Sequence, residues 1–168
     1  VLPLCALLVI NPRLLFYLLL ASRCSLDPIL DSARFSSSIG LGAILNLQMI
    51  ACAIMVFLQS PNVRFKQCIS LWIAPILVMV IGLLFSPEPL PAAKRMIAFM
   101  SYFAAFSVAL VVVYEGNLRT LLRVVLLSAL VPVAIGLWQL FTGNLYTEGR
   151  LNSTFTHPNI YAFYCLLV

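Results

Sequence analysis

The stretch MIAFMSYFAAFSVALVVVY, Met96–Tyr114, decides the fold class of this chain. It carries no charged side chain, and as a helix it would cross the hydrocarbon core of a bilayer, which takes roughly 20 residues. The whole chain has the same character, because 63% of its 168 residues are hydrophobic and only 9% are charged. A soluble domain carries roughly 25% charged residues. We therefore expect an all-α integral membrane protein.

Three further apolar runs predict membrane helices of similar length: Ile39–Leu58, Cys68–Phe85 and Thr120–Phe141. Pro132 lies in the middle of the last run, where it frees a backbone carbonyl and is expected to kink the helix. A few strongly polar residues also lie within these runs, namely Asn46, Gln48 and Gln139. We expect them to form hydrogen bonds between helices, and a polar cavity is the alternative.

The first 22 residues divide at the sequence NPR, Asn11–Arg13. One helix through the apolar runs on both sides, Val1–Ile10 and Leu14–Ser22, would place Arg13 near the middle of the membrane. That position costs about 2.5 to 3.5 kcal/mol on insertion scales. We therefore expect the end of one helix, a turn and a short second helix. A signal peptide is the alternative, although no convincing small-residue cleavage site follows.

The last apolar run, Ile160–Val168, is too short to cross a bilayer, because as a helix it covers only about 13 Å. We expect the chain to be the N-terminal part of a longer polytopic protein. Residues 1–168 would form a single transmembrane domain, a truncated helical bundle with about five to seven membrane helices. Activity is expected to need the part that follows.

Residues 142–159 are expected to form an extracytoplasmic loop. Alternation along the chain then places residues 60–67 and 115–119 in the cytoplasm and residues 86–95 outside. The number of Lys and Arg residues does not decide between the two orientations, but the charge density per loop favours this one.

The net charge of +5 does not indicate a nucleic-acid partner, since no basic cluster with interleaved aromatic residues is present. In a membrane protein, Lys and Arg set orientation and meet anionic headgroups, so membrane lipids are the expected partners. The cysteines lack CxxC or metal-ligand spacing, and we interpret them as small buried hydrophobic residues. They are Cys5, Cys24, Cys52, Cys68 and Cys165.

The segment EGRLNSTFTHPNIYAFY, Glu148–Tyr164, places polar and turn-forming residues directly before an apolar run. Pro158 suits the first turn of a helix and Asn159 can cap it, so both are expected to shape the helix entrance. A helix N-terminus with Arg150 nearby is suited to bind an anion. The alternative is that Arg150 and His157 are ordinary interfacial residues that contact headgroups.

The stretch GRLNSTFTHPNIYAFY resembles the segment that marks the O-antigen ligase and polymerase family of bacterial membrane proteins. In that family an Arg, a short Gly/Ser/Thr-aromatic stretch and a His-Pro-Asn or Pro-Asn precede a membrane helix. Ser153 stands where many members carry Gly. Three further stretches resemble family elements in the same order: LLLASRCSLDPIL (Leu18–Leu30), FSPEPLPAAKRMIAFMSYFAAF (Phe85–Phe106) and VPVAIGLWQLFTG (Val131–Gly143).

The resemblance implies a glycan polymerase or ligase of the cell envelope, a glycosyltransferase of the bacterial cytoplasmic (inner) membrane. Such enzymes transfer a glycan from a polyprenyl diphosphate carrier to an acceptor hydroxyl on the outer face. The acceptor is a growing polysaccharide in exopolysaccharide and O-antigen polymerases and a lipid A core sugar in lipopolysaccharide ligases. Because the diphosphate bond already stores the activation, no metal or other cofactor is expected.

Arg150 matches the arginine of the family motif and is predicted to contact the diphosphate, because a guanidinium stabilises negative charge with bidentate donors. Lys94 and Arg95 would lie on the same face and complete a cationic rim, and interfacial anchoring is the alternative. His157 is a candidate general base. A base resembling that of the family is instead expected beyond residue 168, in the family's long external loop.

Two other classes of protein remain open. A fragment of a membrane transporter would favour charges within helices and an internal repeat, and neither is evident in the sequence. The sequence is also compatible with a non-catalytic membrane subunit.

Overall fold

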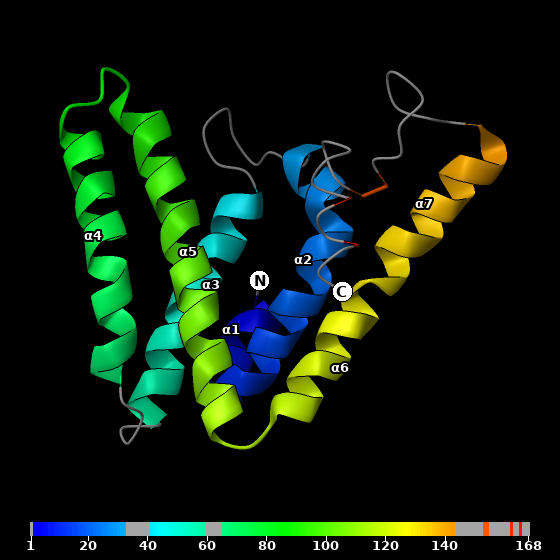
Figure 1. The fold of residues 1–168 in the computed structure, drawn as a ribbon, viewed down its shortest axis with the longest axis horizontal. Coiled ribbons are helices and arrows are strands. Elements are labelled where there is room, and N and C mark those ends of the chain that lie inside the picture. Colours follow the sequence, from blue (N-terminus) through cyan, green and yellow to red (C-terminus); the bar gives the residue numbers. More distant parts are fainter. Residues whose placement is uncertain are drawn as a thin grey trace. The chain divides into compact units, whose positions relative to one another are not determined.

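The computed structural model describes residues 2–32, 41–59 and 65–143, together with Ser153, Thr154, Ala162 and Cys165. The described residues form seven helices and no strand, which confirms the all-α class for this part of the chain. Figure 1 shows α1 (Leu2–Ile10), α2 (Pro12–Ser32), α3 (Leu41–Gln59), α4 (Phe65–Leu84), α5 (Pro89–Tyr114), α6 (Leu118–Ser128) and α7 (Leu130–Thr142).

Three described stretches are long and apolar enough to cross a membrane: Gly42–Gln59 in α3, Pro89–Tyr114, which is α5, and Leu118–Thr142, which covers α6 and α7. Helix α4 adds a shorter apolar stretch, Trp72–Leu84. These stretches indicate a membrane protein. The five to seven membrane helices expected from the sequence are not confirmed.

The first helix is interrupted where the NPR sequence predicts. Helix α1 ends at Ile10 and α2 begins at Pro12. The side-chain oxygen of Asn11 accepts a hydrogen bond from the backbone N–H of Leu14 at 3.0 Å, which caps the new helix. Pro12 follows at the first helical position, where its missing N–H costs nothing. Helix α2 is longer than expected because polar residues end an apolar run without ending the backbone hydrogen bonding of a helix.

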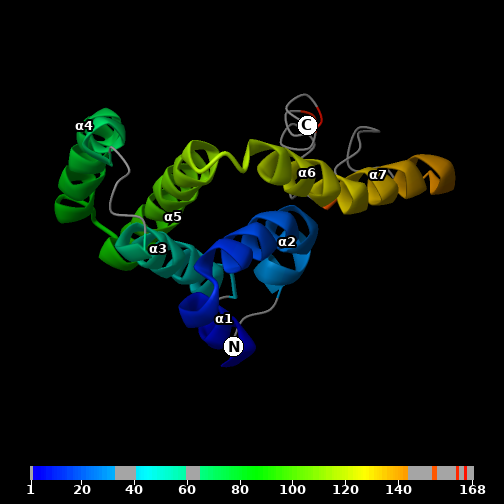
Figure 2. The same cartoon turned by 90° about the horizontal axis from the view of Figure 1, so that it is seen from below.

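The run around Pro132 forms two helices rather than one kinked helix. Pro132 lacks the N–H that would bond to the carbonyl of Ser128, and α6 ends at Ser128. The residue after Ser128 is Ala129, and its backbone N–H bonds to the carbonyl of Leu126 at 3.1 Å. This bond spans three residues, as in a 3₁₀ turn. Helix α7 then begins at Leu130, and Figure 2 shows the two helices following one another along the chain.

The chain divides into two compact units, each with its own contacts. The first unit comprises Val1–Phe16 and Ala43–Asn117, and the second comprises Tyr17–Gly42 and Leu118–Val168. The first unit therefore contains α1, the start of α2, nearly all of α3, and the whole of α4 and α5. The second contains the rest of α2, from Tyr17 onward, together with α6 and α7.

Helices α4 and α5 of the first unit form an antiparallel hairpin, drawn in green in Figure 1. Aromatic packing joins them, because the Trp72 ring of α4 lies 5.5, 5.3 and 5.9 Å from the ring centroids of Phe99, Phe103 and Phe106 in α5. Tilted and edge-on pairs of this kind contribute about 0.5–1.5 kcal/mol beyond the area that they bury. The hairpin positions the cavity described below.

The buried face of α5 carries small and β-branched residues at spacings of three and four: Ser101, Ala104, Ser107, Val108 and Val111. Ser101 Oγ donates a hydrogen bond to Asn46 Oδ1 in α3 at 3.0 Å. The hydrogen bond between helices that the sequence predicts for Asn46 is therefore present. Gln48, two residues further along α3, differs from Asn46, because its buried side-chain oxygen has no hydrogen-bond partner among the described residues.

Candidate functional site

A cavity of about 510 Å³ lies between the last turns of α4 and the first turns of α5. Its walls are mainly apolar and include Val78 and Leu83 of α4 and Ala92 of α5. Glu88 and Arg95 supply its charged groups. The volume falls in the range of roughly 300–1,000 Å³ that is typical of ligand sites, and apolar walls with a few polar groups are typical of them too.

Ser86 shapes the turn that brings the two helices together. Its Oγ accepts a hydrogen bond from the backbone N–H of Glu88 and lies within hydrogen-bond distance of the Glu88 carbonyl, both at 3.2 Å. Pro89 then begins α5 at a position that suits proline. Because the turn is this short, the end of α4 and the first turns of α5 enclose the cavity from both sides.

Two neighbouring cations of α5, Lys94 and Arg95, are separated by the geometry of the helix. Successive helical residues point about 100° apart. Arg95 lines the cavity, whereas Lys94 is exposed and does not line it. Arg95 forms no hydrogen bond or ion pair with another residue of the described part of the chain, so its guanidinium donors are available to a ligand.

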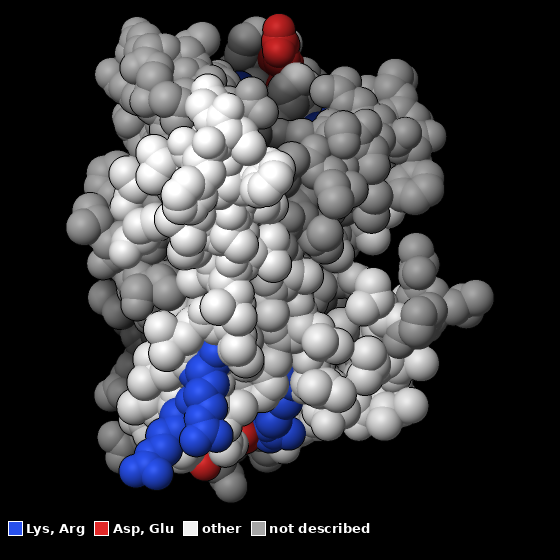
Figure 3. Space-filling view, turned by 90° about the vertical axis from the view of Figure 1, so that its right-hand side faces the viewer, with Lys and Arg blue, Asp and Glu red and all other residues white. Residues whose placement is uncertain are grey.

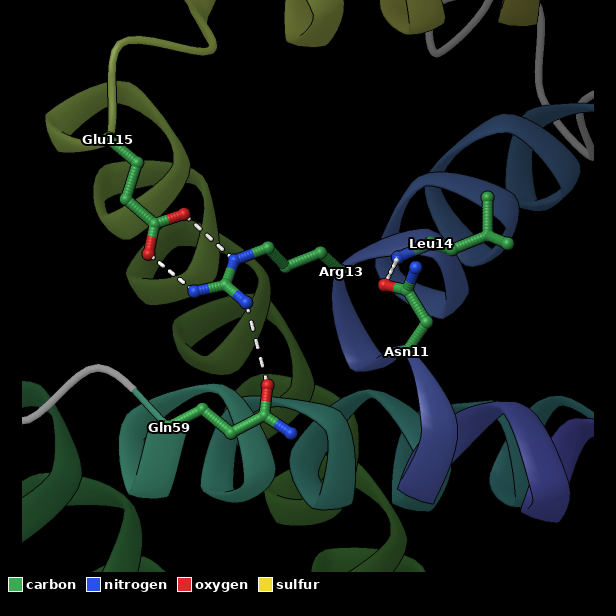
Figure 4. A network of polar contacts seen from close by, with 5 residues as sticks. All are labelled: Asn11, Arg13, Leu14, Gln59 and Glu115. Atoms are coloured by element: carbon green, nitrogen blue, oxygen red, sulfur yellow. Dashed lines mark hydrogen bonds and ion pairs between the residues drawn. The ribbon is translucent and has the colours of Figure 1, made fainter.

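A second arginine, Arg13, is fully engaged (Figure 4). Its Nε and Nη2 donate to the two carboxylate oxygens of Glu115 at 2.8 and 2.5 Å, which is a bidentate ion pair. Its Nη1 lies 3.5 Å from Gln59 Oε1. The contacts join the start of α2, the end of α3 and the residue that follows α5. Glu115 therefore provides the partner that Arg13 needs within an apolar sequence.

The ion pair and the cavity lie at opposite ends of α5, since Glu115 follows its last residue and Glu88 precedes its first. At 1.5 Å per residue, the helix between them is about 39 Å long, which exceeds the roughly 30 Å hydrocarbon core of a bilayer. Both sites can therefore reach a membrane interface. Which end faces the cytoplasm stays a prediction.

Two residues of the family-like segment, Ser153 and Thr154, are described, and both are buried. The backbone N–H of Ser153 donates to Gln139 Oε1 at 2.8 Å, and Ser153 Oγ donates to the carbonyl of Pro132. Gln139 thus bonds to the backbone of this segment. The φ angle of Ser153 is 52°, in the left-handed region that glycine adopts without strain.

Four predicted site residues lie outside the described residues: Arg150, His157, Pro158 and Asn159. The cationic rim that would combine Lys94 and Arg95 with Arg150 is therefore still a prediction. The sequence reasoning did not identify Glu88 as a cavity residue or Glu115 as the partner of Arg13. A signal for the second was present, because an arginine in an apolar run needs a counter-charge and Glu115 directly follows the charge-free run Met96–Tyr114.

Helix α6 carries Arg119 and Arg123 one turn apart, both exposed and with no acidic residue in the helix. Figure 3 shows blue Lys and Arg side chains, with some red acidic atoms beside them, next to a white surface of uncharged residues. Such a distribution suits residues at the edge of a membrane. Within the described ranges, no group of three or more His, Cys, Asp or Glu residues is placed to hold a metal ion.

No protein-family model, curated protein or solved structure matched this chain.

Proposed function

We propose that the chain is part of a membrane glycosyltransferase, a glycan polymerase or ligase that uses a polyprenyl-diphosphate-linked glycan. The observation that carries the proposal is the cavity of the α4–α5 hairpin, where the available guanidinium of Arg95 adjoins apolar walls. This combination suits a ligand with an anionic head and a hydrocarbon chain. The resemblance of the segment around Arg150 to the family motif supports the same substrate.

Each part of the cavity matches one part of such a donor. The guanidinium of Arg95 offers paired N–H donors to phosphate oxygens. The apolar side chains of Val78, Leu83 and Ala92 suit the first isoprenyl units. The carboxylate of Glu88 is a hydrogen-bond acceptor for sugar hydroxyls.

In this proposal, Arg95 binds the donor, and Arg150 stabilises the charge that grows on the diphosphate as it leaves. The transfer occurs at the outer face of the inner membrane, to a growing polysaccharide or a lipid A core sugar.

The test uses the full-length protein in lipid nanodiscs with a polyprenyl-diphosphate oligosaccharide as the probe. Arg95→Gln and Lys94→Gln form a matched pair, because each removes one cation and only Arg95 lines the cavity. We expect Arg95→Gln to weaken donor binding by roughly 10-fold or more, as for loss of a charged hydrogen bond. Lys94→Gln should change it by less than about 3-fold.

Equal, small effects of both variants would show that Arg95 is only an interfacial anchor, and would remove the cavity from the proposal. Donor binding without any transfer by the wild-type protein, in the presence of acceptor glycan or lipid A core, would identify a non-catalytic subunit. Movement of the intact lipid-linked glycan across the bilayer, without transfer, would identify a transporter.

A further inference from the structure

The residues after α7 return to this helix at Ser153. Helix α7 ends at Thr142, and Gly143 follows with a φ angle of 68°, the left-handed conformation that commonly ends helices. Ser153 then contacts α7 at two positions, Gln139 through its backbone N–H and Pro132 through its hydroxyl. Ser153 therefore lies against the helix that precedes it in the chain.

The two contacts converge on one part of the α7 surface. A helical side chain leans toward the N-terminus of its helix, so the Gln139 amide reaches back in the direction of Gly136. A helical carbonyl points the other way, so the Pro132 oxygen is directed forward to Gly136. Pro132 and Gly136 are both buried, and the glycine carries no side chain to keep another backbone away.

Several features show that this contact is specific. Ser153 holds a backbone conformation that is unfavourable for residues other than glycine, and in this conformation its backbone N–H bonds to Gln139. Ser153 and its neighbour Thr154 are only 8% and 2% exposed. A strained residue persists where its surroundings determine its conformation, and such positions are concentrated at functional sites.

We propose that Gln139 and Ser153 are positioning residues that anchor the segment of Arg150 to α7. The inference rests on the proposed function for the role of Arg150, whereas the anchor itself rests on the contacts of Ser153. Arg150 precedes Ser153 by three residues, so covalent geometry alone keeps their Cα atoms within about 10 Å. An anchor at Ser153 therefore limits where the guanidinium can reach.

Such an anchor matters because charge stabilisation depends on geometry. A displacement of about 1 Å in a reacting group can lower the rate by roughly 100-fold. Loosening the anchor should therefore reduce the turnover of the bound donor more than it reduces the binding of the donor. A purely structural role would not predict this difference.

The first test measures the anchor without any enzyme assay. Thr154→Cys is introduced into the full-length protein, and modification of this cysteine by a thiol reagent is followed by peptide mass spectrometry, which separates it from the native cysteines. We expect slow modification, because residue 154 is buried. Adding Gln139→Leu should accelerate it by about 5-fold or more, whereas Gln139→Glu, which retains an oxygen acceptor, should preserve the protection.

Leu137→Ala is the control on the same helix, because Leu137 is exposed and, unlike Gln139, has no polar side-chain atom that could bond to the N–H of Ser153. It should leave the modification rate unchanged. If Gln139→Leu does not accelerate modification relative to this control, the anchor is absent and the inference is wrong, whatever the protein does.

The second test measures glycan transfer by the same variants without the added cysteine. We expect Gln139→Leu to lower kcat by about 10-fold with a change in donor KM of less than about 3-fold, and Gln139→Glu to restore most of the loss. Accelerated modification with unchanged kcat would overturn the positioning role. Accelerated modification in a protein that binds donor but never transfers glycan would overturn the proposed function and leave the anchor intact.

Substitutions of Ser153 separate its two contacts. Ser153→Gly keeps the backbone N–H and suits the left-handed φ angle, and it loses only the hydroxyl bond to Pro132. Ser153→Val also keeps the N–H but resists the conformation, since its side chain is β-branched. We expect residue 154 to remain protected in the glycine variant and to react about 5-fold faster in the valine variant. The reverse order would overturn the proposed anchor.

Discussion

Arg13 and Arg95 both belong to the first unit, but they differ in whether their guanidinium groups bond to other residues of the protein. Arg13 uses both edges of its guanidinium inside the protein, pairing with Glu115 and contacting Gln59. Arg95 lines the cavity of the α4–α5 hairpin and has no ion pair with any described residue. The difference indicates that Arg13 stabilises the fold, whereas Arg95 is available for a negative charge that comes from outside the chain.

The surroundings explain this difference. The side chains of Arg13 and Glu115 are 32% and 27% exposed, so each is partly removed from water and needs the other as compensation. Arg95 is exposed, and water or headgroups can solvate it when no ligand is bound. Substitutions at the first site should therefore change stability, and substitutions at the second should change ligand binding.

The largest effect is expected at a third arginine, Arg150, which lies outside the described residues. If it resembles Arg95 in being available to a ligand, Arg150→Ala should lower glycan transfer by about 100-fold or more, as loss of a donor to a developing charge does. The measurement is transfer by the full-length protein, with its melting temperature as the control. A large drop in melting temperature with normal transfer would place Arg150 in the same class as Arg13.

The next effect concerns the ion pair itself. Arg13→Ala and Glu115→Ala should each lower the free energy of unfolding by about 1–2 kcal/mol, between the values for surface and buried pairs. The double variant should lose less than the sum, with a coupling of about 1 kcal/mol. Unfolding in detergent measures all three, and strictly additive losses would show that the pair contributes no interaction energy.

The same conservative substitution at both sites sharpens the comparison. Lysine keeps the charge but cannot form the bidentate contact of arginine. Arg13→Lys should therefore lower the free energy of unfolding by about 1 kcal/mol and leave donor binding unchanged. Arg95→Lys should weaken donor binding by roughly 3- to 5-fold and leave the unfolding free energy unchanged. Thermal unfolding and donor titration are measured on both variants, and an exchange of the two effects would contradict the comparison.

The smallest effects extend the comparison to uncharged groups in α3. Asn46 is hydrogen-bonded to Ser101, whereas the buried oxygen of Gln48 has no partner among the described residues. Asn46→Leu should lower the free energy of unfolding by about 0.5–1.5 kcal/mol, as loss of a hydrogen bond between membrane helices does. Gln48→Leu should be neutral or slightly stabilising, because it removes an uncompensated buried acceptor. Equal losses in thermal unfolding would contradict this distinction.

The positions of the helices could largely be predicted because their signals are local. The apolar run Met96–Tyr114 lies within α5, which begins seven residues earlier, at Pro89, and includes the charged residues Lys94 and Arg95. The break at Asn11 follows from proline and capping chemistry in three consecutive residues. At Pro132 the local chemistry was recognised, but its result was not, since a kink and a break differ only in how the freed carbonyls are satisfied.

The candidate site was less predictable. Lys94 and Arg95 are indistinguishable as adjacent cations in the sequence, and only the position of α4 decides that Arg95 lines the cavity. Glu88 had no pattern that marked it as part of the same cavity. Ser153 was noted as a departure from the resembled family, but no local pattern selects Gln139 and Pro132 as its partners.

The amino-acid sequence alone determined that this protein is helical and apolar, and where its first helix must end, because hydropathy, proline and capping act over a few residues. The tertiary structure decided which polar groups meet. Arg13 and Glu115 are 102 residues apart, and no local rule selects that partner. Their contact depends on the relative positions of the start of α2 and the end of α5 within the first unit, which are set by the packing of many side chains together. The same dependence on packing leaves Arg95 beside a cavity and brings Ser153 back to α7.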